Sequence, residues 1–462
     1  METLSTKSTP PSRRRTQTRR RLVAGGAAGV ATVVVTACGA GGAQQTASGD
    51  ARKTKQPATL QWQSSIAGGG DQTRQKNWDL LLDRFQEKNP HVTVQRSYLP
   101  SGEHYEKVIV GLAGGSMPDL FSSIVTRVPS WANKGVTLKL DDFAKRNKLD
   151  LGDFTAQSIE SCTFKGKLNF LPQQDSFYIL LVNKDLFEKN GVPLPGTNLK
   201  WDDIPTVAKK LTKDANGDGK LDEWGFYAPS GDKQWISAMW INGATYMDEK
   251  ATKSTLDQPA AIGAVQSYVD LWQRHQVAPA RTDLTQTAIA AWTTGKLGMY
   301  MQLNQYFGQL RDQSQFKWDV AMLPEGKGGR GTPRETYPFG IGSLTKGPDA
   351  AWQVLDYMTS AEVQKHYNVA TGQWPTRKSV QDDYIKSYPQ GQPPAGLSAV
   401  LEMERKNHAR VWPVATTWIE IAADWAAAMA PVYTGQATVA QAHQQLKPKF
   451  DAYLEEHQRL IK

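Results

Sequence analysis

The opening of the folded region alternates apolar and polar stretches in a way that predicts a strand, a helix and a second strand. Residues 59–62 and 92–94 are short apolar runs rich in strand-forming residues. Between them, apolar side chains recur at helical spacing at Trp78, Leu81, Leu82 and Phe85. A parallel unit of this kind offers space for a ligand at the carboxyl ends of its strands.

Two apolar runs with an extended polar piece between them occupy residues 166–191. The runs are 168–171 and 179–182, and the piece between them, 173–178, is polar and aromatic. Two buried strands joined in this way are typical either of a chain that crosses between two lobes or of a loop inside one lobe. The local pattern alone favours the loop.

Ordered motifs make the chain similar to the family-1 extracellular solute-binding proteins. These are the sugar-binding receptors of bacterial ABC importers, and they are related to maltose-binding protein. The family pattern G-K-x-Y-x-x-P, followed by Y-N-K-D-L-F-x-K-x-G, is matched at Gly166, Lys167, Pro172, Asn183, Lys184, Asp185, Leu186, Phe187, Lys189 and Gly191. Asn169 and Val182 replace the two tyrosines. Further matches are P-D-L-F at 118–121, W-G-F at 224–226 and G-x-x-P-x-R at 372–377.

This resemblance implies an α/β fold of the periplasmic-binding-protein type. Two lobes would be joined by three interlobe crossings, with a ligand cleft between them. One lobe would combine about 58–174 with 324–378, and the other 179–323 with 380–462. Ligand binding would close the lobes by a hinge motion.

The first 58 residues carry export signals. Residues 18–21 (T-R-R-R) fit the twin-arginine pattern, and 22–37 is an apolar run too short and too small-sided to span a membrane. The run ends in V-T-A-C, which resembles a lipobox. We therefore expect 1–37 to be a twin-arginine signal peptide of the lipoprotein type, Cys38 to carry the lipid, and 38–58 to be a flexible tether. A plain secretory signal is the alternative.

The charge and the cysteine content limit the classes of function that the chain can have. The net charge is +9, but residues 1–37 hold seven Arg and Lys against one Glu, which leaves +3 and gives no reason to expect nucleic acid. If Cys38 is lipidated, Cys162 is a lone thiol, expected to be buried. The chain lacks the common nucleotide-binding, zinc-protease and serine-hydrolase motifs, so we predict that it is not an enzyme.

Residues 214–225 begin like a calcium-binding EF-hand loop. Asp214, Asn216, Asp218 and Asp222 could offer oxygen ligands. The twelfth position, however, is Gly225 instead of the glutamate that such loops require. We expect a solvated turn, and we predict no cofactor.

The candidate ligand-binding residues follow predicted strand ends or lie on the predicted crossing. Aromatic rings stack on the C–H faces of sugars, while hydroxyl and amide groups bind the sugar hydroxyls. The candidates are Trp62, Ser64, Ser122, Ser123, Gln174, Asp175, Ser176, Trp235, Trp240, Asn242, Gly243, Asn304, Tyr306, Trp374, Arg377 and Trp412. Trp240 and Trp412 are the preferred stacking platforms. The resemblance implies that maltodextrin binders have a carboxylate where Ser176 stands, which makes maltose itself doubtful.

The predicted function is the capture of a sugar or oligosaccharide for an ABC importer, with the membrane permease as partner. We expect a monomer, anchored by lipid to the outer face of the cytoplasmic membrane. One alternative is a receptor for glycerol phosphate or another polyol phosphate, with Arg127 and Arg377 as phosphate ligands. Another is a surface glycoside hydrolase, because paired carboxylates cannot be recognised from sequence.

Overall fold

A computed structural model describes residues 50–53, 55–66, 72–227, 230–279, 287–387 and 394–462. The predicted signal peptide, the lipidation site Cys38 and residues 38–49 of the predicted tether lie outside the described residues. Residues Ala47–Lys462 form one compact unit, and this unit is described below. Among its described helices, none combines the length and the apolar character needed to cross a bilayer.

The larger of two main sheets has six strands in the order β13-β6-β12-β3-β1-β2. Its strands are β1 (Ala58–Ile66), β2 (Val92–Pro100), β3 (Leu120–Ser122), β6 (Leu171–Ser176), β12 (Glu335–Ile341) and β13 (Trp374–Pro375). β1 runs parallel to β2 and β3, which confirms the predicted parallel unit. β12 runs antiparallel to both β3 and β6, so residues far apart in the chain become neighbours.

Seven helices accompany this sheet: α1 (Gln72–Lys88), α2 (Ser101–Ala113), α3 (Val128–Asn133), α4 (Asp141–Arg146), α5 (Ala156–Ser161), α12 (Pro348–Met358) and α13 (Ala361–Thr371). The buried residues of α1 are the four apolar residues predicted to face a core. They pack in one hydrophobic core with residues of β1, α12 and α13. A short hairpin, β4 (Thr163–Phe164) and β5 (Lys167–Leu168), precedes β6.

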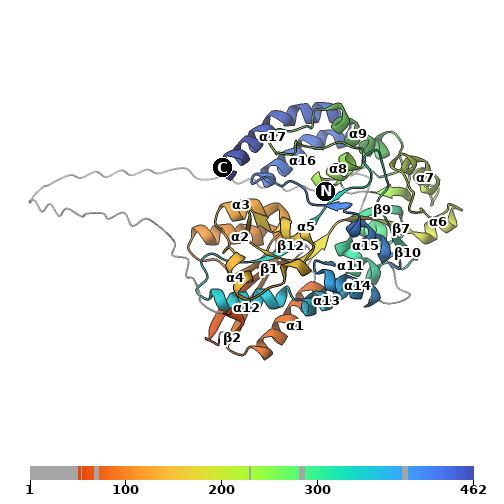
Figure 1. The fold of residues 1–462 in the computed structure, drawn as a ribbon. Coiled ribbons are helices and arrows are strands. Elements are labelled where there is room, and N and C mark those ends of the chain that lie inside the picture. The colour runs from red at the N-terminus through yellow and green to blue at the C-terminus, as the bar shows by residue number, and fades with distance from the viewer. Residues whose placement is uncertain (1–49, 54, 67–71, 228–229, 280–286, 388–393) are drawn as a thin grey trace, which may run out of the picture. The chain divides into compact units, whose positions relative to one another are not determined.

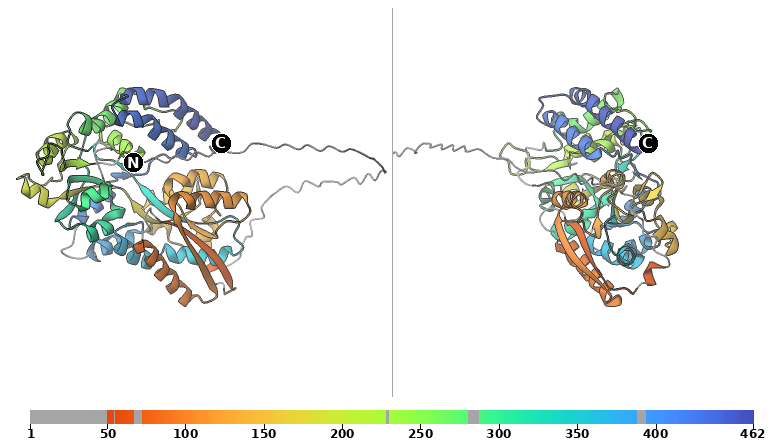
Figure 2. Two further views of the ribbon diagram at one scale, coloured as in Figure 1. Left: turned by 180° about the vertical axis from the view of Figure 1, so that it is seen from behind. Right: turned by 90° about the vertical axis from the view of Figure 1, so that its left-hand side faces the viewer.

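The smaller main sheet has four strands in the order β10-β7-β9-β8. They are β7 (Tyr178–Asn183), β8 (Trp224–Tyr227), β9 (Leu297–Leu303) and β10 (Trp318–Ala321). The helices that follow them are α6 (Lys184–Lys189), α7 (Ile204–Leu211), α8 (Asp232–Ile241), α9 (Pro259–Gln273), α10 (Ala288–Thr293), α11 (Phe307–Gln313), α14 (Lys378–Ser387), α15 (Leu397–Arg405), α16 (Trp418–Tyr433) and α17 (Val439–Ile461). This sheet and most of these helices share a second hydrophobic core. Figures 1 and 2 show α16 and α17 together at one end of the unit and β1 and β2 at the other.

The chain passes from the larger sheet to the smaller one within a single residue. β6 ends at Ser176 and β7 begins at Tyr178, so only Phe177 stands between the two sheets. The structure therefore decides between the two interpretations of residues 166–191 in favour of a crossing. It confirms the α/β class, whereas the count of three crossings and the exact lobe boundaries stay predictions.

A third, two-stranded pairing also joins distant segments. β11 (Thr332–Pro333) runs parallel to β14 (Ala409–Arg410), just before the chain enters β12. It places the residues that lead into β12 beside the segment that follows α15.

Candidate functional site

Polar side chains gather where β6 and β12 end beside the smaller sheet. Glu335 pairs with Ser176, Thr336 with Asp175 and Tyr337 with Gln174. Because side chains alternate between the two faces of a strand, Glu335 and Tyr337 lie on one face and Thr336 on the other. We call the first the ligand face and the second the hinge face.

The hinge face holds a buried ion triad. Arg334 donates to Asp175 Oδ2 and to Glu404 Oε2, each at 2.5 Å. Asp175 also accepts from Ser158 Oγ at 2.6 Å and from Thr336 Oγ1 at 2.7 Å. Burial opposes the charge on Arg334, but the two carboxylates outweigh it and raise the pKa of Arg334. The triad joins β6 to α15, and it leaves Asp175 without a free face for a ligand, which corrects its assignment as a ligand-binding residue.

The ligand face holds an ion pair between elements that pack in different cores. Lys233, in the first turn of α8, lies 3.6 Å from Glu335, with Nζ facing Oε2. The Glu335 side chain is only 1% exposed, and its Oε1 has no hydrogen-bond partner among the described residues. Burial raises the pKa of Glu335 to about 7, although the charge of Lys233 opposes the rise. A buried carboxylate oxygen without a donor marks a place where a ligand or water binds.

Tyrosines surround this ion pair. Burial raises the pKa values of Tyr105, Tyr178 and Tyr337, and the nearby charge of Glu335 adds to each rise. Tyr306 is half-buried and close enough to influence the pKa of Tyr178 and of Tyr337. The predicted candidate Tyr306 therefore lies in the same cluster as Glu335.

Hydroxyl groups lie in the last residues of β1 and β3, close to where the sequence placed the strand ends. The backbone amide of Ser65 donates to Ser122 Oγ at 2.9 Å, and Ser64 is buried beside it. His104 Nε2 lies 2.8 Å from the Ser122 carbonyl oxygen, so this nitrogen carries the proton and Nδ1 accepts from Gln63 Nε2 at 3.0 Å. Burial lowers the pKa of His104 to about 4, which keeps the ring neutral.

The smaller sheet contributes Asn304, directly after β9. Asn304 Oδ1 accepts from Ser176 Oγ at 3.0 Å and from the Phe177 amide at 2.8 Å, so it holds the crossing in place. Four buried atoms near these strand ends have no hydrogen-bond partner among the described residues: Ser123 Oγ, Asn304 Nδ2, Gln305 Oε1 and Glu335 Oε1. Both donors and acceptors are therefore available. We call these groups, with the surrounding tyrosines and Lys233, the polar seam.

The five tryptophans predicted to face the ligand pack in the two hydrophobic cores instead. Trp62 contacts Phe339 at a centroid distance of 4.6 Å, Trp235 contacts Trp425 at 5.1 Å, and Trp412 contacts Trp418 at 4.9 Å. Trp374 packs beside Phe177 and Tyr384, and Arg410 lies over the ring of Trp240. Partners distant in sequence therefore cover most of each ring. Trp412 also lines a hollow, and the role of the five rings in ligand binding stays a prediction.

Three further predicted residues also have structural partners. Asn242 ends α8 by donating to the Ala238 carbonyl at 2.8 Å, and Gly243 follows with a positive φ of 78°. Arg377 donates to the Thr359 carbonyl at 2.8 Å and to Asp153 Oδ2 at 3.0 Å. We therefore leave all three out of the site.

The site residues predicted from the sequence did not include Glu335, Tyr337, Tyr105 and Lys233. The first residues of β12 are mostly polar and include Pro338, so they do not have the apolar pattern of a buried strand. One signal was available: polar and aromatic residues at alternate positions, Glu335 and Tyr337, immediately before an apolar strand.

The acidic loop at 214–222 uses its side chains to bind its own backbone. Asp214 accepts from the amides of Gly217 and Gly219, each at 2.7 Å, and Asp222 accepts from Ala215 at 2.9 Å. Asn216 and Asp218 accept from amides two residues further on. In the described part of the chain, no group of three or more His, Cys, Asp or Glu side chains could hold a metal. The prediction for calcium stays untested.

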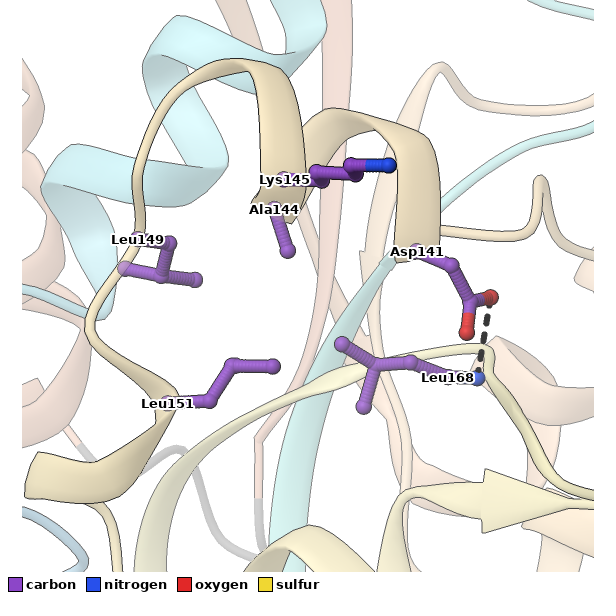
Figure 3. A pocket seen from close by; sticks show the side chains of 6 residues that line it. All are labelled: Asp141, Ala144, Lys145, Leu149, Leu151 and Leu168. Carbon is purple, nitrogen blue, oxygen red and sulfur yellow. Dashed lines mark hydrogen bonds between the residues drawn. The ribbon is translucent and has the colours of Figure 1, made fainter.

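Two of the hollows among the described residues have mainly apolar linings. One, of about 240 Å³, is lined by Ala144, Leu149, Leu151 and Leu168, with Asp141 and Lys145 at its edge (Figure 3). Its aliphatic side chains point into the space, and Asp141 Oδ2 is already bound to the Leu168 amide at 3.2 Å. The other, of about 560 Å³, lies between residues 125–129, 160–165 and 411–414 and has a mainly apolar lining that includes Trp412. Neither offers a set of unpaired polar atoms suited to a sugar.

Comparisons with known proteins agree with this architecture. The family model described as bacterial extracellular solute-binding protein matches residues 69–365. A binding protein of Brucella abortus (strain 2308) is 27% identical over 360 residues, which cover 76% of this chain and 83% of that protein. An ABC substrate-binding protein of Listeria monocytogenes in complex with cycloalternan superposes with a TM-score of 0.77 at 22% identity, covering 86% and 98% of the two chains. The maltose-bound MalE3 protein of T. maritima gives a TM-score of 0.72 at 22% identity, covering 85% and 99%.

Proposed function

Because this chain belongs to the bacterial extracellular solute-binding proteins, we propose that it captures a sugar or oligosaccharide and delivers it to the permease of an ABC importer. Family membership makes it an exported binding protein, not an enzyme. The choice of a carbohydrate is the further step that we propose.

The observation that carries this proposal is the set of unpaired polar atoms in the polar seam. Ser123 Oγ, Asn304 Nδ2, Gln305 Oε1 and Glu335 Oε1 are all buried without a hydrogen-bond partner among the described residues. Each sugar hydroxyl can both donate and accept, so a polyhydroxylated ligand satisfies such a mixed set. Tyr306 and Tyr337 are half-buried near Glu335, and we propose that their rings stack on a sugar ring.

The same region is less suited to a phosphate ester. Arg377 is bound to Asp153 and Thr359. Arg127 lies 4.1 Å from the centre of the Tyr105 ring, and burial lowers its pKa. Both arginines predicted as phosphate ligands are therefore engaged elsewhere or partly desolvated, and we favour the sugar over the polyol phosphate.

In the proposed mechanism, ligand binding closes the two lobes and the closed form docks on the permease. Export by the twin-arginine route and a lipid on Cys38 would keep the receptor at the outer face of the cytoplasmic membrane. Replacing Cys38 by serine should move the protein from the membrane fraction to the soluble fraction. A Cys38→Ser protein that stayed in the membrane fraction would show that the lipobox interpretation is wrong.

A thermal-shift screen tests the ligand class. Purified residues 39–462, which include the whole compact unit, would be mixed with maltose, cellobiose, cycloalternan, ribitol and glycerol 3-phosphate. A ligand that prefers the folded state raises the melting temperature. We expect a sugar or sugar alcohol to do so, without turnover of aryl glycosides. Stabilisation by glycerol 3-phosphate alone, or hydrolysis of a glycoside, would overturn the proposal.

A further inference from the structure

We propose that Glu335 and Lys233 form a clasp that binds one hydroxyl group of an uncharged ligand between the two cores. This inference rests on the proposed function, because it assigns the ligand class and two specificity-determining residues of the same site.

The two members of the clasp come from elements that pack in different cores. Glu335 is the first residue of β12, in the larger sheet, and Lys233 is the second residue of α8, most of whose residues pack in the core of the smaller sheet. Their charged groups are 3.6 Å apart, which is longer than a charge-assisted hydrogen bond of about 2.8 Å. The two side chains face each other without a short direct bond, so a hydroxyl can contact both.

The unused atoms of the pair match a hydroxyl group. Glu335 Oε1 is buried and lacks a donor among the described residues, while its Oε2 faces Lys233. A ligand hydroxyl can donate its proton to Oε1 and accept one of the three protons of the ammonium group. The neighbouring acid, Asp232, accepts from Trp418 Nε1 at 3.2 Å. Of these two acids, Glu335 is the one with an oxygen that is buried and lacks a donor among the described residues.

The charge around the clasp favours an uncharged ligand. The negative charges of Glu335 and Asp232 offset the positive charge of Lys233. Burial lowers the pKa of Lys233, but both acids raise it. Arg127 stacks on Tyr105 and interacts with Glu420. A phosphate or carboxylate would have to enter beside two carboxylates, at a cost that burial increases. Sugars and sugar alcohols bring hydroxyl groups without that charge.

Several tyrosines lie near enough to the clasp for the charge of Glu335 to act on their pKa values. Tyr105, Tyr178 and Tyr337 interact electrostatically with Glu335, and Tyr105 also interacts with Lys233. Tyrosine faces suit the C–H surfaces of a pyranose, while the clasp binds one of its hydroxyls.

The test is to measure binding of the same panel by calorimetry to the wild type, Glu335→Gln and Lys233→Met. Each substitution keeps the size of the side chain and removes its charge. Loss of a buried hydrogen bond to a charged group should weaken sugar binding about 10- to 100-fold. The double variant should be little weaker than either single variant, because both act on one hydroxyl. Glu362→Gln is the matched control, since Glu362 pairs with Lys88 on the surface.

The outcomes separate this inference from the proposed function. A panel sugar that binds the wild type and both single variants within about two-fold would refute the clasp and leave the sugar receptor standing. If no sugar or sugar alcohol of the panel binds the wild type, both proposals are wrong. Melting temperatures of the variants show whether they fold. If Glu335→Gln does not fold, Lys233→Met on the opposite side decides the question alone.

Discussion

Glu335 and Ser176 are direct partners on two neighbouring antiparallel strands, β12 and β6. The family resemblance implies that maltodextrin binders have a carboxylate at the position of Ser176. Here Ser176 donates to Asn304, and the carboxylate stands one strand away, at Glu335. In the proposed site the acidic group is therefore supplied by β12, instead of by the crossing. Because the carboxylate lies on a neighbouring strand, it would bind a different hydroxyl group of the sugar. We therefore expect the protein to prefer a ligand other than maltose.

Ligand affinity should rise with pH as Glu335 ionises. The pKa of Glu335 in the free protein is about 7, and its neighbours are Lys233 and Asp232 from α8, Tyr337 from β12, Tyr178 from β7 and Tyr105 from α2. If a ligand hydroxyl donates to the ionised carboxylate, binding lowers this pKa. Affinity should therefore increase by about three-fold or more between pH 5.5 and pH 8.

Calorimetry across this pH range on the wild type and Glu335→Gln measures the effect. The ligand affinity of Glu335→Gln should not change with pH, because its amide does not titrate. A wild-type profile that is flat as well would show that the ligand does not contact the ionised form.

The buried triad should contribute strongly to stability. Arg334→Met leaves Asp175 and Glu404 buried without their cation, and breaking such a pair costs about 3–5 kcal/mol. Urea unfolding would show this loss as a lower midpoint. Arg405→Met is the control, because Arg405 and its partner Asp382 are each 65% exposed. Equal midpoints for the two variants would contradict the importance of the triad.

The parts of the fold that could be predicted depend on local pattern. The four buried residues of α1 and the parallel pairing of β1 with β2 followed from periodicity and order. The crossing at 166–191 needed the family resemblance as well, since its own pattern favoured a loop. Because Ser176 and Tyr178 belong to different sheets, the interpretation of this segment as a loop inside one lobe is excluded.

The candidate site could be predicted only in part, because its chemistry depends on contacts between distant residues. Nothing around Asp175 in the sequence shows that Arg334, 159 residues later, neutralises it. The burial of Trp235 likewise depends on Trp425. Ser123 and Asn304 were predicted correctly as residues at strand ends, and both have buried polar atoms unpaired among the described residues. Whether they bind a ligand stays a prediction.

Trp412 should now be tested as a core residue. Its ring packs on Trp418, and its Nε1 donates to the Arg334 carbonyl at 3.0 Å. Trp412→Ala should lower the free energy of unfolding by about 3–5 kcal/mol. Trp412→Phe, which keeps most of the packing, should fold and bind a panel sugar with unchanged affinity. Weaker binding by a stable Trp412→Phe protein would return this ring to the ligand site.

Two buried histidines should make the protein less stable in acid. Burial lowers the pKa of His104 and of His443 to about 4, against 6.5 in an unfolded chain. Between these values the unfolded state binds more protons, so stability is full above pH 6.5 and is lost as the pH falls towards 4. The loss should amount to about 2 kcal/mol for each histidine.

Urea unfolding at pH 7 and pH 4.5 measures this loss. His443→Asn keeps a donor for the Leu256 carbonyl, which lies 2.9 Å from Nδ1 of the histidine, and should remove about half of the loss that is due to these two histidines. Glu335 acts in the opposite direction: its raised pKa gives stability below pH 4.5 that is lost as the pH rises through about 7. Glu335→Gln should therefore lose stability more steeply on acidification than the wild type. A His443→Asn protein with the full wild-type pH dependence would show that this histidine is already protonated in the folded state.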